Sequence, residues 1–175
     1  LEQGALRLAW AGYQADSPRL VLTAVGAYQL DQALRASARL AERAVPHSVV
    51  SMLEPGRFRI SRAAGEAQHA APDSLKAELY PDTAPARVFV VHTRPEPLLG
   101  TLAPLSTGPR HTAALGFVNH GGTMNIAGLL FANRCSWAHV LAEAARVLEL
   151  PREELLTADE LAALDGVGSP ESVLG

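Results

Sequence analysis

The feature that most constrains the fold of this chain is a nearly continuous apolar run, Arg19 to Val25, with an amphipathic helical pattern directly behind it. An uninterrupted apolar run of strand length is typical of a strand covered on both faces, because a strand with one face in water alternates polar and apolar residues. A second such run, Ser48 to Leu53, follows Pro46 and the helix predicted over Tyr28 to Arg43. Strand, helix and strand in this order predict a right-handed βαβ unit, and therefore an α/β fold.

The first predicted helix carries one apolar stripe, because small or apolar residues recur at intervals of three and four. We expect the stripe to face the core and the polar positions between its members to face solvent. The stripe consists of Leu30, Ala33, Leu34, Ser37, Ala38 and Ala41, and the residues predicted to point away are Asp31, Gln32, Arg35, Arg39 and Glu42.

The middle of the chain continues the alternation of strands and helices. Glu54 to Pro72 is predicted to be a surface loop. Ser136 is the predicted N-cap of a later helix. The stripe of that helix is Trp137, Val140, Leu141, Ala144 and Leu148. The other predicted strands are Leu6 to Trp10 at an edge, Arg87 to His92 and His111 to Phe117, and the other predicted helices are Asp73 to Leu79 and Leu98 to Leu102.

The last part of the chain has a helical pattern of its own. Pro151 suits the first turn of a helix, and Thr157 stands three residues before Glu160, which is the spacing of a capping box. Gly166 to Gly175 is predicted to be a fraying terminus. We therefore predict an α/β domain over residues 1–150 and a helical extension with a tail over residues 151–175.

The candidate functional edge is the glycine-rich loop Gly116 to Asn125, which lies between two apolar runs. Glycines permit close backbone approach, while amide, imidazole and hydroxyl side chains supply donors and acceptors. Two interpretations stand for this loop: contact with an anion or sugar phosphate through backbone N–H groups, or a tight turn at a subunit interface. The candidate substrate-binding or anion-binding residues are His92, Asn119, His120, Gly121, Gly122, Thr123 and Asn125.

Three other groups of side chains also have two interpretations each. His92 ends a buried strand, where open α/β sheets place ligand contacts, but a hydrogen-bonded structural histidine fits the same position. Cys135 follows an arginine near a possible helix N-terminus, which would lower the thiol pKa, yet a nucleophile also needs a histidine close in space. The loop arginines Arg57, Arg59 and Arg62 either contact a phosphorylated substrate or form a solvated basic surface.

The composition argues against several classes of partner. The net charge is −3, from 15 basic and 18 acidic residues, so neither nucleic acid nor an anionic membrane is an expected partner. Cys135 is the sole cysteine, which precludes an intramolecular disulfide, and the six histidines show no metal-binding spacing, so no metal site is predicted. With no secretory signal and no apolar run of about 18 residues, the expected location is the cytoplasm.

Several segments of the chain together carry a resemblance to a known family. The opening run Leu20 to Tyr28 is followed by an Ala/Leu helix and by Val49 to Met52. Later come a strand ending in histidine, a Gly-aromatic pair, a polar Gly-Thr turn and a segment with an aromatic residue: Val88 to His92, Gly116-Phe117, Gly121-Gly122-Thr123 and Asn133 to Trp137. These segments resemble the C-terminal domain of the thiamine-diphosphate enzymes of the transketolase superfamily, and the later ones are most similar to phosphoketolases. The chain departs from the family pattern at Thr93-Arg94 and at Asn125 to Leu129.

The resemblance implies a three-layer α/β sandwich with a mostly parallel five-stranded sheet and one antiparallel edge strand. In such enzymes thiamine diphosphate and Mg²⁺ lie between two other domains, on Gly-Asp-Gly and Asn-Asn motifs that this chain lacks. The implied role is therefore accessory, with no catalytic residue and no cofactor bound by this chain. The parent enzyme would act on sugar phosphates or 2-keto substrates. In it, this domain would contact the other domains, assist folding and homodimer formation, and help to complete the substrate channel.

Two other functions stay open on the residues alone. The first is a free-standing or fused regulatory module that has kept the fold, lost the chemistry and holds a small anion at the loop Asn119 to Asn125. The second is an independent small enzyme that uses His92, His120 or Cys135. Ligand binding by the chain itself would favour the first, and turnover by the chain itself would favour the second.

Overall fold

The computed structural model describes residues 3–118 and 122–174. Its centre is a five-stranded sheet in the order β1-β3-β2-β4-β5, in which β1 is antiparallel to β3 and all other neighbours are parallel. The fold predicted from the resemblance, a mostly parallel sheet with one antiparallel edge strand, is confirmed. The strands are β1 (Ala5–Arg7), β2 (Leu20–Val25), β3 (His47–Met52), β4 (Ala86–Val91) and β5 (Thr112–Leu115).

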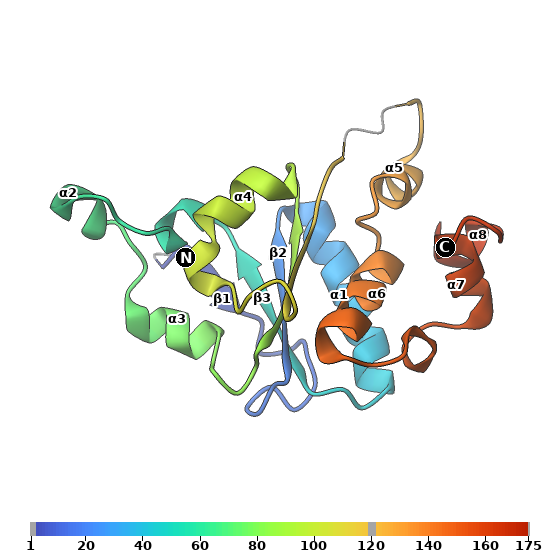
Figure 1. Ribbon diagram of the computed structural model, residues 1–175, viewed down its shortest axis with the longest axis horizontal. Coiled ribbons are helices and arrows are strands. Elements are labelled where there is room, and N and C mark those ends of the chain that lie inside the picture. The colour runs from blue at the N-terminus through green and yellow to red at the C-terminus, as the bar shows by residue number, and fades with distance from the viewer. Residues whose placement is uncertain (1–2, 119–121, 175) are drawn as a thin grey trace.

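Helices cover both faces of the sheet, and Figure 1 shows the resulting layers with the sheet in the middle. One face packs against α1 (Ala27–Glu42) and α6 (Trp137–Leu148), and the other packs against α3 (Asp73–Leu79) and α4 (Pro95–Thr101). Along β2 the side chains alternate between two separate cores, Leu20 and Leu22 in one and Val21 and Val25 in the other. This double burial explains why β2 reads as a continuous apolar run.

Shorter elements complete the chain. The segment 54–72, predicted to be a loop, contains η1 (Pro55–Phe58) and α2 (Ala64–Ala67). Most of the segment lies at the surface, as predicted, but Phe58 is fully buried and anchors the first of these turns, which the prediction of a loop did not anticipate. The helix predicted over Leu98 to Leu102 is α4, which begins earlier, at Pro95. The remaining elements are η2 (Ala103–Leu105), α5 (Ile126–Ala132), η3 (Arg152–Glu154), α7 (Ala158–Leu164) and α8 (Glu171–Leu174).

The buried face of α1 differs from its predicted stripe. Gln32, expected to face solvent, is 5% exposed and its Oε1 accepts a hydrogen bond from Trp137 N at 2.8 Å. Leu40 is fully buried, whereas Ala38 is exposed. The cause is that α1 packs against α6 as well as against the sheet, so its buried face is turned toward both. The predicted stripe of α6 is confirmed, since all of its members are buried.

The predicted fraying of the last residues was also wrong. Val173, in α8, is 2% exposed, and its carbonyl oxygen accepts a hydrogen bond from Trp137 Nε1 at 2.8 Å. The capping box of α7 is confirmed, with Thr157 Oγ1 and Glu160 each bonding the other's backbone N–H. Side chains of the extension join the same hydrophobic core as α1 and α6. A division of the chain at residue 150 stays a prediction.

No helix in the described ranges 3–118 and 122–174 combines the length and the apolar character that a membrane span requires.

Candidate functional site

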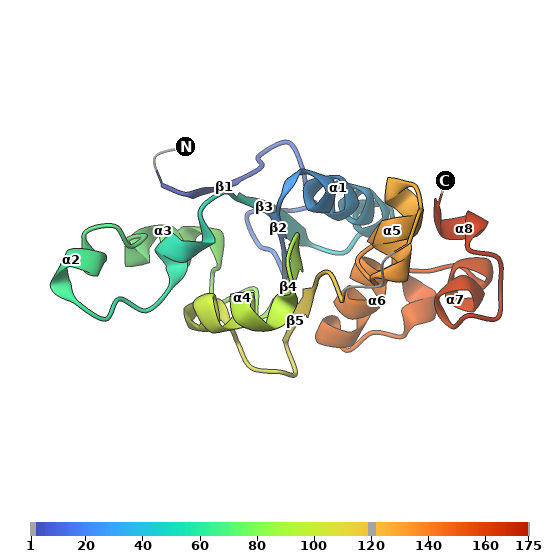
Figure 2. The same ribbon diagram turned by 90° about the horizontal axis from the view of Figure 1, so that it is seen from above.

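The carboxyl ends of β2 and β4 form the point of the sheet at which the chain changes direction. From β2 the chain crosses to β3 on one side, and it then returns across β2 to β4 and β5 on the other side. Figure 2 shows that α1, which follows β2, and α4, which follows β4, lie on opposite faces of the sheet. Crevices outside such strand ends are where open α/β folds place their ligands.

His92 lies at this point, directly after β4. Its backbone N donates to the carbonyl oxygen of Val25 at 3.1 Å, and its ring Nδ1 lies 3.0 Å from the same oxygen. A carbonyl only accepts hydrogen bonds, so Nδ1 carries the proton that it donates. In the neutral ring Nε2 is then an acceptor, and His92 as a whole is exposed. The structural hydrogen bond expected for this histidine is present, and Nε2 remains able to accept a hydrogen bond from a hydroxyl group.

The start of the glycine-rich loop lies next to His92. Phe117 N donates to the carbonyl oxygen of Thr93 at 3.0 Å, which ties the residue after His92 to the end of β5. A Cβ at Gly116 would collide with that same carbonyl oxygen and would lie 2.7 Å from Val91 Cγ2. Gly116 is therefore a position at which two backbones come too close for any side chain.

The predicted site residues within the loop are only partly placed. Asn119, His120 and Gly121 lie outside the described residues, while Gly122, Thr123 and Asn125 are exposed. Asn125 is the N-cap of α5, and its Oδ1 accepts from Gly128 N at 2.8 Å. One of the N–H groups that an anion would use at this helix start is therefore occupied by the chain itself. The anion-binding interpretation of the loop stays a prediction.

Asn133 is a residue of this site that the sequence did not single out. It is fully buried, its Nδ2 donates to the carbonyl oxygen of Leu129 at 2.9 Å, and its Oδ1 accepts from Val118 N at 3.1 Å. It therefore fixes the first part of the loop to the end of α5. No local signal reveals this, because its loop partner lies 15 residues away in sequence.

Cys135 does not have the environment expected of a reactive thiol. It is fully buried, its Sγ donates to the carbonyl oxygen of Leu130 at 3.4 Å, and burial raises its thiol pKa to about 11. The prediction of a lowered pKa was wrong because desolvation outweighs the neighbouring positive charge.

Ser136 does hold the N-cap position of α6, but its Oγ bonds to His139 Nδ1 at 2.7 Å instead of capping the backbone.

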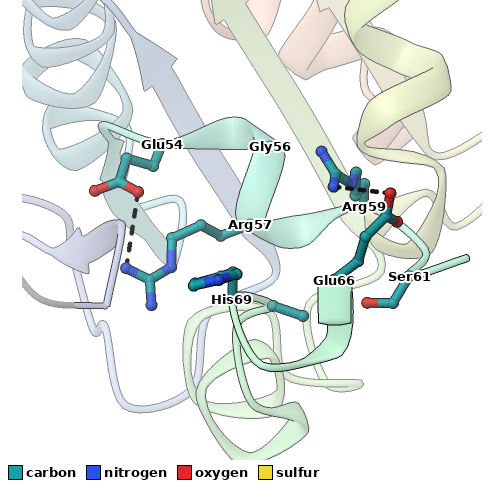
Figure 3. A pocket seen from close by; sticks show the side chains of 8 residues that line it. Glu54, Gly56, Arg57, Arg59, Ser61, Glu66 and His69 are labelled. Carbon is teal, nitrogen blue, oxygen red and sulfur yellow. Dashed lines mark ion pairs between the residues drawn. The ribbon is translucent and has the colours of Figure 1, made fainter. Parts of the chain in front are cut away.

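Two of the loop arginines, Arg57 and Arg59, line a pocket of about 210 Å³ between η1 and α2. Figure 3 shows Arg59 facing Glu66 on one side of the pocket and Arg57 facing Glu54 on the other. Glu66 Oε1 lies 3.4 Å from Arg59 Nη2 and 3.2 Å from Arg62 Nη2. Hydrogen bonds from the backbone and side chain of Arg62 lower the pKa of the Glu66 carboxyl. These contacts favour a basic surface balanced by its own carboxylates over a phosphate site.

In the described part of the chain, no three His, Cys, Asp or Glu side chains are grouped so as to hold a metal ion.

The fold is similar to part of the transketolases. Transketolase from Leishmania mexicana matches with a TM-score of 0.55 and 17% identity, over 85% of this chain and 18% of its own. Transketolase from Campylobacter jejuni subsp. jejuni NCTC 11168 matches with a TM-score of 0.55 and 13% identity, over 85% of this chain and 19% of its own. No protein-family model and no curated protein sequence matches. At such identities the likeness shows the α/β fold, and the chain spans less than a fifth of either transketolase.

Proposed function

We propose that this chain is an accessory domain of a thiamine-diphosphate-dependent enzyme of the transketolase or phosphoketolase type, acting on sugar phosphates or 2-keto substrates. The observation that carries the proposal is the fold comparison: 85% of this chain matches a segment that makes up only 18% of a transketolase. We infer from this small share that the domain functions together with other domains of a larger enzyme. The cofactor and its Mg²⁺ belong to those other domains, and a cytoplasmic location stays a prediction.

The carboxyl edge of the sheet supports a docking role for the domain. Val118, Met124 and Ile126 are 42%, 45% and 46% exposed, and all three lie around the loop that follows β5. Figure 1 shows that α5 lies toward the carboxyl ends of the strands. Exposed apolar side chains gathered at one edge favour an interface with another protein surface. We assign this edge to the homodimer contact and to the neighbouring domains of the parent enzyme.

His92 is the residue that we assign to the substrate channel. Its Nδ1–H is held by Val25 O, which leaves Nε2 as the atom that can accept a hydrogen bond from a substrate hydroxyl. The position at the strand end, beside the start of the loop, is the one at which α/β folds contact their ligands.

Sedimentation velocity of the chain and two variants tests the docking role. Ile126→Glu places a charge on the proposed interface at the first turn of α5, where an acidic residue suits the helix dipole and leaves the fold intact. Val167→Glu is the control, since Val167 is 84% exposed in the C-terminal extension. We expect a dimer for the chain and for Val167→Glu and a monomer for Ile126→Glu. A chain that stays monomeric, or an Ile126→Glu dimer as stable as the original, would contradict this role.

Calorimetric titration separates the accessory role from the alternative ones. We expect no binding of thiamine diphosphate with Mg²⁺, because the accessory role leaves the cofactor to other domains. Tight binding would overturn the accessory role. Binding of inorganic phosphate that disappears in His120→Ala would instead favour an anion-binding module at the loop.

A further inference from the structure

A second pocket, separate from the loop arginines, opens where β5 ends beside α6 and α7. Its volume is about 390 Å³, within the range of about 300–1,000 Å³ that is usual for small-molecule sites. Its apolar lining consists of Leu115 at the end of β5, Ala142 on α6 and Leu164 on α7. The helices α6 and α7 contact each other. The pocket thus combines an apolar wall with the polar groups described next.

Most charged side chains of this pocket are neutralised by the chain itself. Arg152 donates to both carboxylate oxygens of Asp165, at 3.1 and 3.0 Å. Glu143 accepts from Arg146 Nε at 2.7 Å. Arg134 differs, because its guanidinium makes no hydrogen bond or ion pair with any residue in the described ranges, although it lines the same pocket. One positive charge is therefore left over.

The position of Arg134 is conformationally costly. Its φ is 57°, in the left-handed region that non-glycine residues seldom adopt. The conformation ends α5, because Arg134 N donates to the carbonyl oxygen of Phe131 and Cys135 N to that of Leu130, each at 2.9 Å, as in a left-handed helix C-terminus. Asn133 and Cys135 on either side are fully buried, and they fix the backbone that presents the arginine.

His139 is the second polar group of the pocket. Its Nδ1 is bonded to Ser136 Oγ at 2.7 Å and its ring packs edge-on against Phe131, with centroids 5.2 Å apart. Burial, together with the charge of Arg134, lowers the pKa of the His139 imidazole to about 4. The ring is therefore neutral at pH 7 and adds a hydrogen-bonding nitrogen without adding charge.

We propose that this pocket binds a small organic monocarboxylate, with its carboxylate on Arg134 and His139 and its apolar body against Leu115, Ala142 and Leu164. The planar guanidinium matches a carboxylate in two parallel hydrogen bonds. The apolar wall accommodates a short aliphatic or aromatic body.

The charges of the pocket select a monoanion. The lining contains two arginines, Arg134 and Arg152, and two carboxylates, Glu143 and Asp165. Asp165 pairs with Arg152, and Glu143 pairs with Arg146, which lies outside the lining, so Arg134 is the charge that one bound negative charge would balance. A dianion such as a phosphate monoester would leave an excess negative charge next to two carboxylates, and like charges at short range repel. Phosphates are therefore expected to bind more weakly than a carboxylate of similar size.

The test is titration of the full chain with hexanoate, followed by isotope-edited NMR of the backbone amides and of the histidine rings. We expect saturable shifts at Leu115, Ala142 and Leu164, and an upward shift of the His139 titration, because a bound anion stabilises the imidazolium. Hexanamide has the same body without the charge, and inorganic phosphate has the charge without the body. Both should bind at least about tenfold more weakly, as expected when a charged hydrogen bond or the apolar contact is lost.

Arg134→Asn is the decisive variant, because asparagine tolerates the left-handed conformation and the fold should persist. We expect hexanoate binding to weaken about tenfold or more in Arg134→Asn and to be unchanged in Arg43→Asn, which removes an exposed arginine at the far end of α1. Absence of saturable binding, or equal affinity in Arg134→Asn and the original chain, would overturn the proposal. Neither result depends on whether the chain forms dimers or has a parent enzyme.

Discussion

The ion pair between Arg39 and Glu160 should be the strongest polar attachment of the C-terminal extension, and its removal gives a quantitative prediction. Arg39 lies on α1, and its Nη1 and Nη2 donate to Glu160 Oε2 and Oε1 of α7, each at 3.0 Å. Glu160 also accepts from Thr157 N at 2.8 Å, so one carboxylate serves both the ion pair and the helix cap. The side chain of Glu160 is only 8% exposed. The substitution Glu160→Gln keeps the shape and removes the charge.

The magnitude follows from what Arg39 keeps after the substitution. Breaking a buried ion pair by removing one partner costs about 3–5 kcal/mol when the remaining charge is left without compensation. Arg39 is 21% exposed and retains Glu42 at 3.3 Å and the carbonyl oxygen of Leu155 at 3.3 Å, so part of its charge stays satisfied. We therefore expect Glu160→Gln to lower the free energy of unfolding by about 2–3 kcal/mol and the Tm by roughly 4–12 °C.

The matched control removes the second carboxylate that forms an ion pair with Arg39. Glu42 is 70% exposed, and an exposed ion pair contributes less than about 1 kcal/mol. We expect Glu42→Gln to stay within about 0.5 kcal/mol of the original chain. The two variants differ mainly in the burial of the carboxylate, so their difference isolates the effect of burial.

Urea unfolding followed by tryptophan fluorescence measures both effects. The chain has two tryptophans, and Trp137 lies under Arg39 with the guanidinium carbon 5.4 Å from its ring centre. Trp10 is 74% exposed, so the substitution Trp10→Phe leaves Trp137 as the reporter. Equal stability of Glu160→Gln and Glu42→Gln would refute the reasoning, because it would show that the buried pair adds nothing beyond an exposed one.

The effect should also depend on pH. Burial opposes ionisation of Glu160, but the hydrogen bonds from Arg39 and Thr157 outweigh it, and the folded-state pKa lies below the ordinary glutamate value of 4.5. A lowered folded-state pKa contributes stability that is present above the unfolded-state pKa and is lost as the pH falls through the folded-state value. The stability difference between the original chain and Glu160→Gln should therefore shrink below pH 4.5. A difference that is constant down to the folded-state pKa would contradict the assignment.

Two further predictions follow from close packing. Gly116→Ala should destabilise the chain by about 1–3 kcal/mol in urea unfolding, because the methyl group would collide with the Thr93 carbonyl oxygen. Gly100→Ala, with open space around it in α4, should instead be neutral or stabilising by up to about 1 kcal/mol; equal effects would contradict the explanation. Cys135 should react with iodoacetamide only after unfolding, since burial raises its thiol pKa to about 11; rapid labelling of the native chain would refute this.

Structural elements whose formation depends on residues close together in the sequence were predictable. The continuous apolar runs at β2, β3 and β4 and the spacing of α6 predicted the buried strands and the packed helix, because side-chain periodicity directly reflects which faces are covered. The capping box of α7 was equally predictable, since Thr157 and Glu160 lie within one turn and each side chain accepts a hydrogen bond from the other residue's backbone N–H. The resemblance to a known family added the antiparallel edge strand, which a periodic pattern does not specify.

The candidate site was predictable only in outline. The end of β4 and the glycine-rich loop were found as strand-to-loop transitions, and Phe117 N does bond to the residue after His92. Asn133 was missed, because its partner Val118 is reached only when α5 folds back on the loop. The pocket of Arg134 and His139 was missed as well, since β5, α6 and α7 meet there only in the folded chain.

The sequence by itself determined the order of the buried strands and of the two long helices, and the double covering of the sheet, because these follow from short-range periodicity and from the burial of apolar surface. Tertiary structure decided which polar residues are buried and how charges pair. Gln32 bonds to Trp137 across 105 positions, Arg39 bonds to Glu160 across 121, and Cys135 becomes inert by burial. A polar side chain has no preferred partner along the chain, and the cost of leaving it unbonded selects a partner only once packing has brought distant segments together.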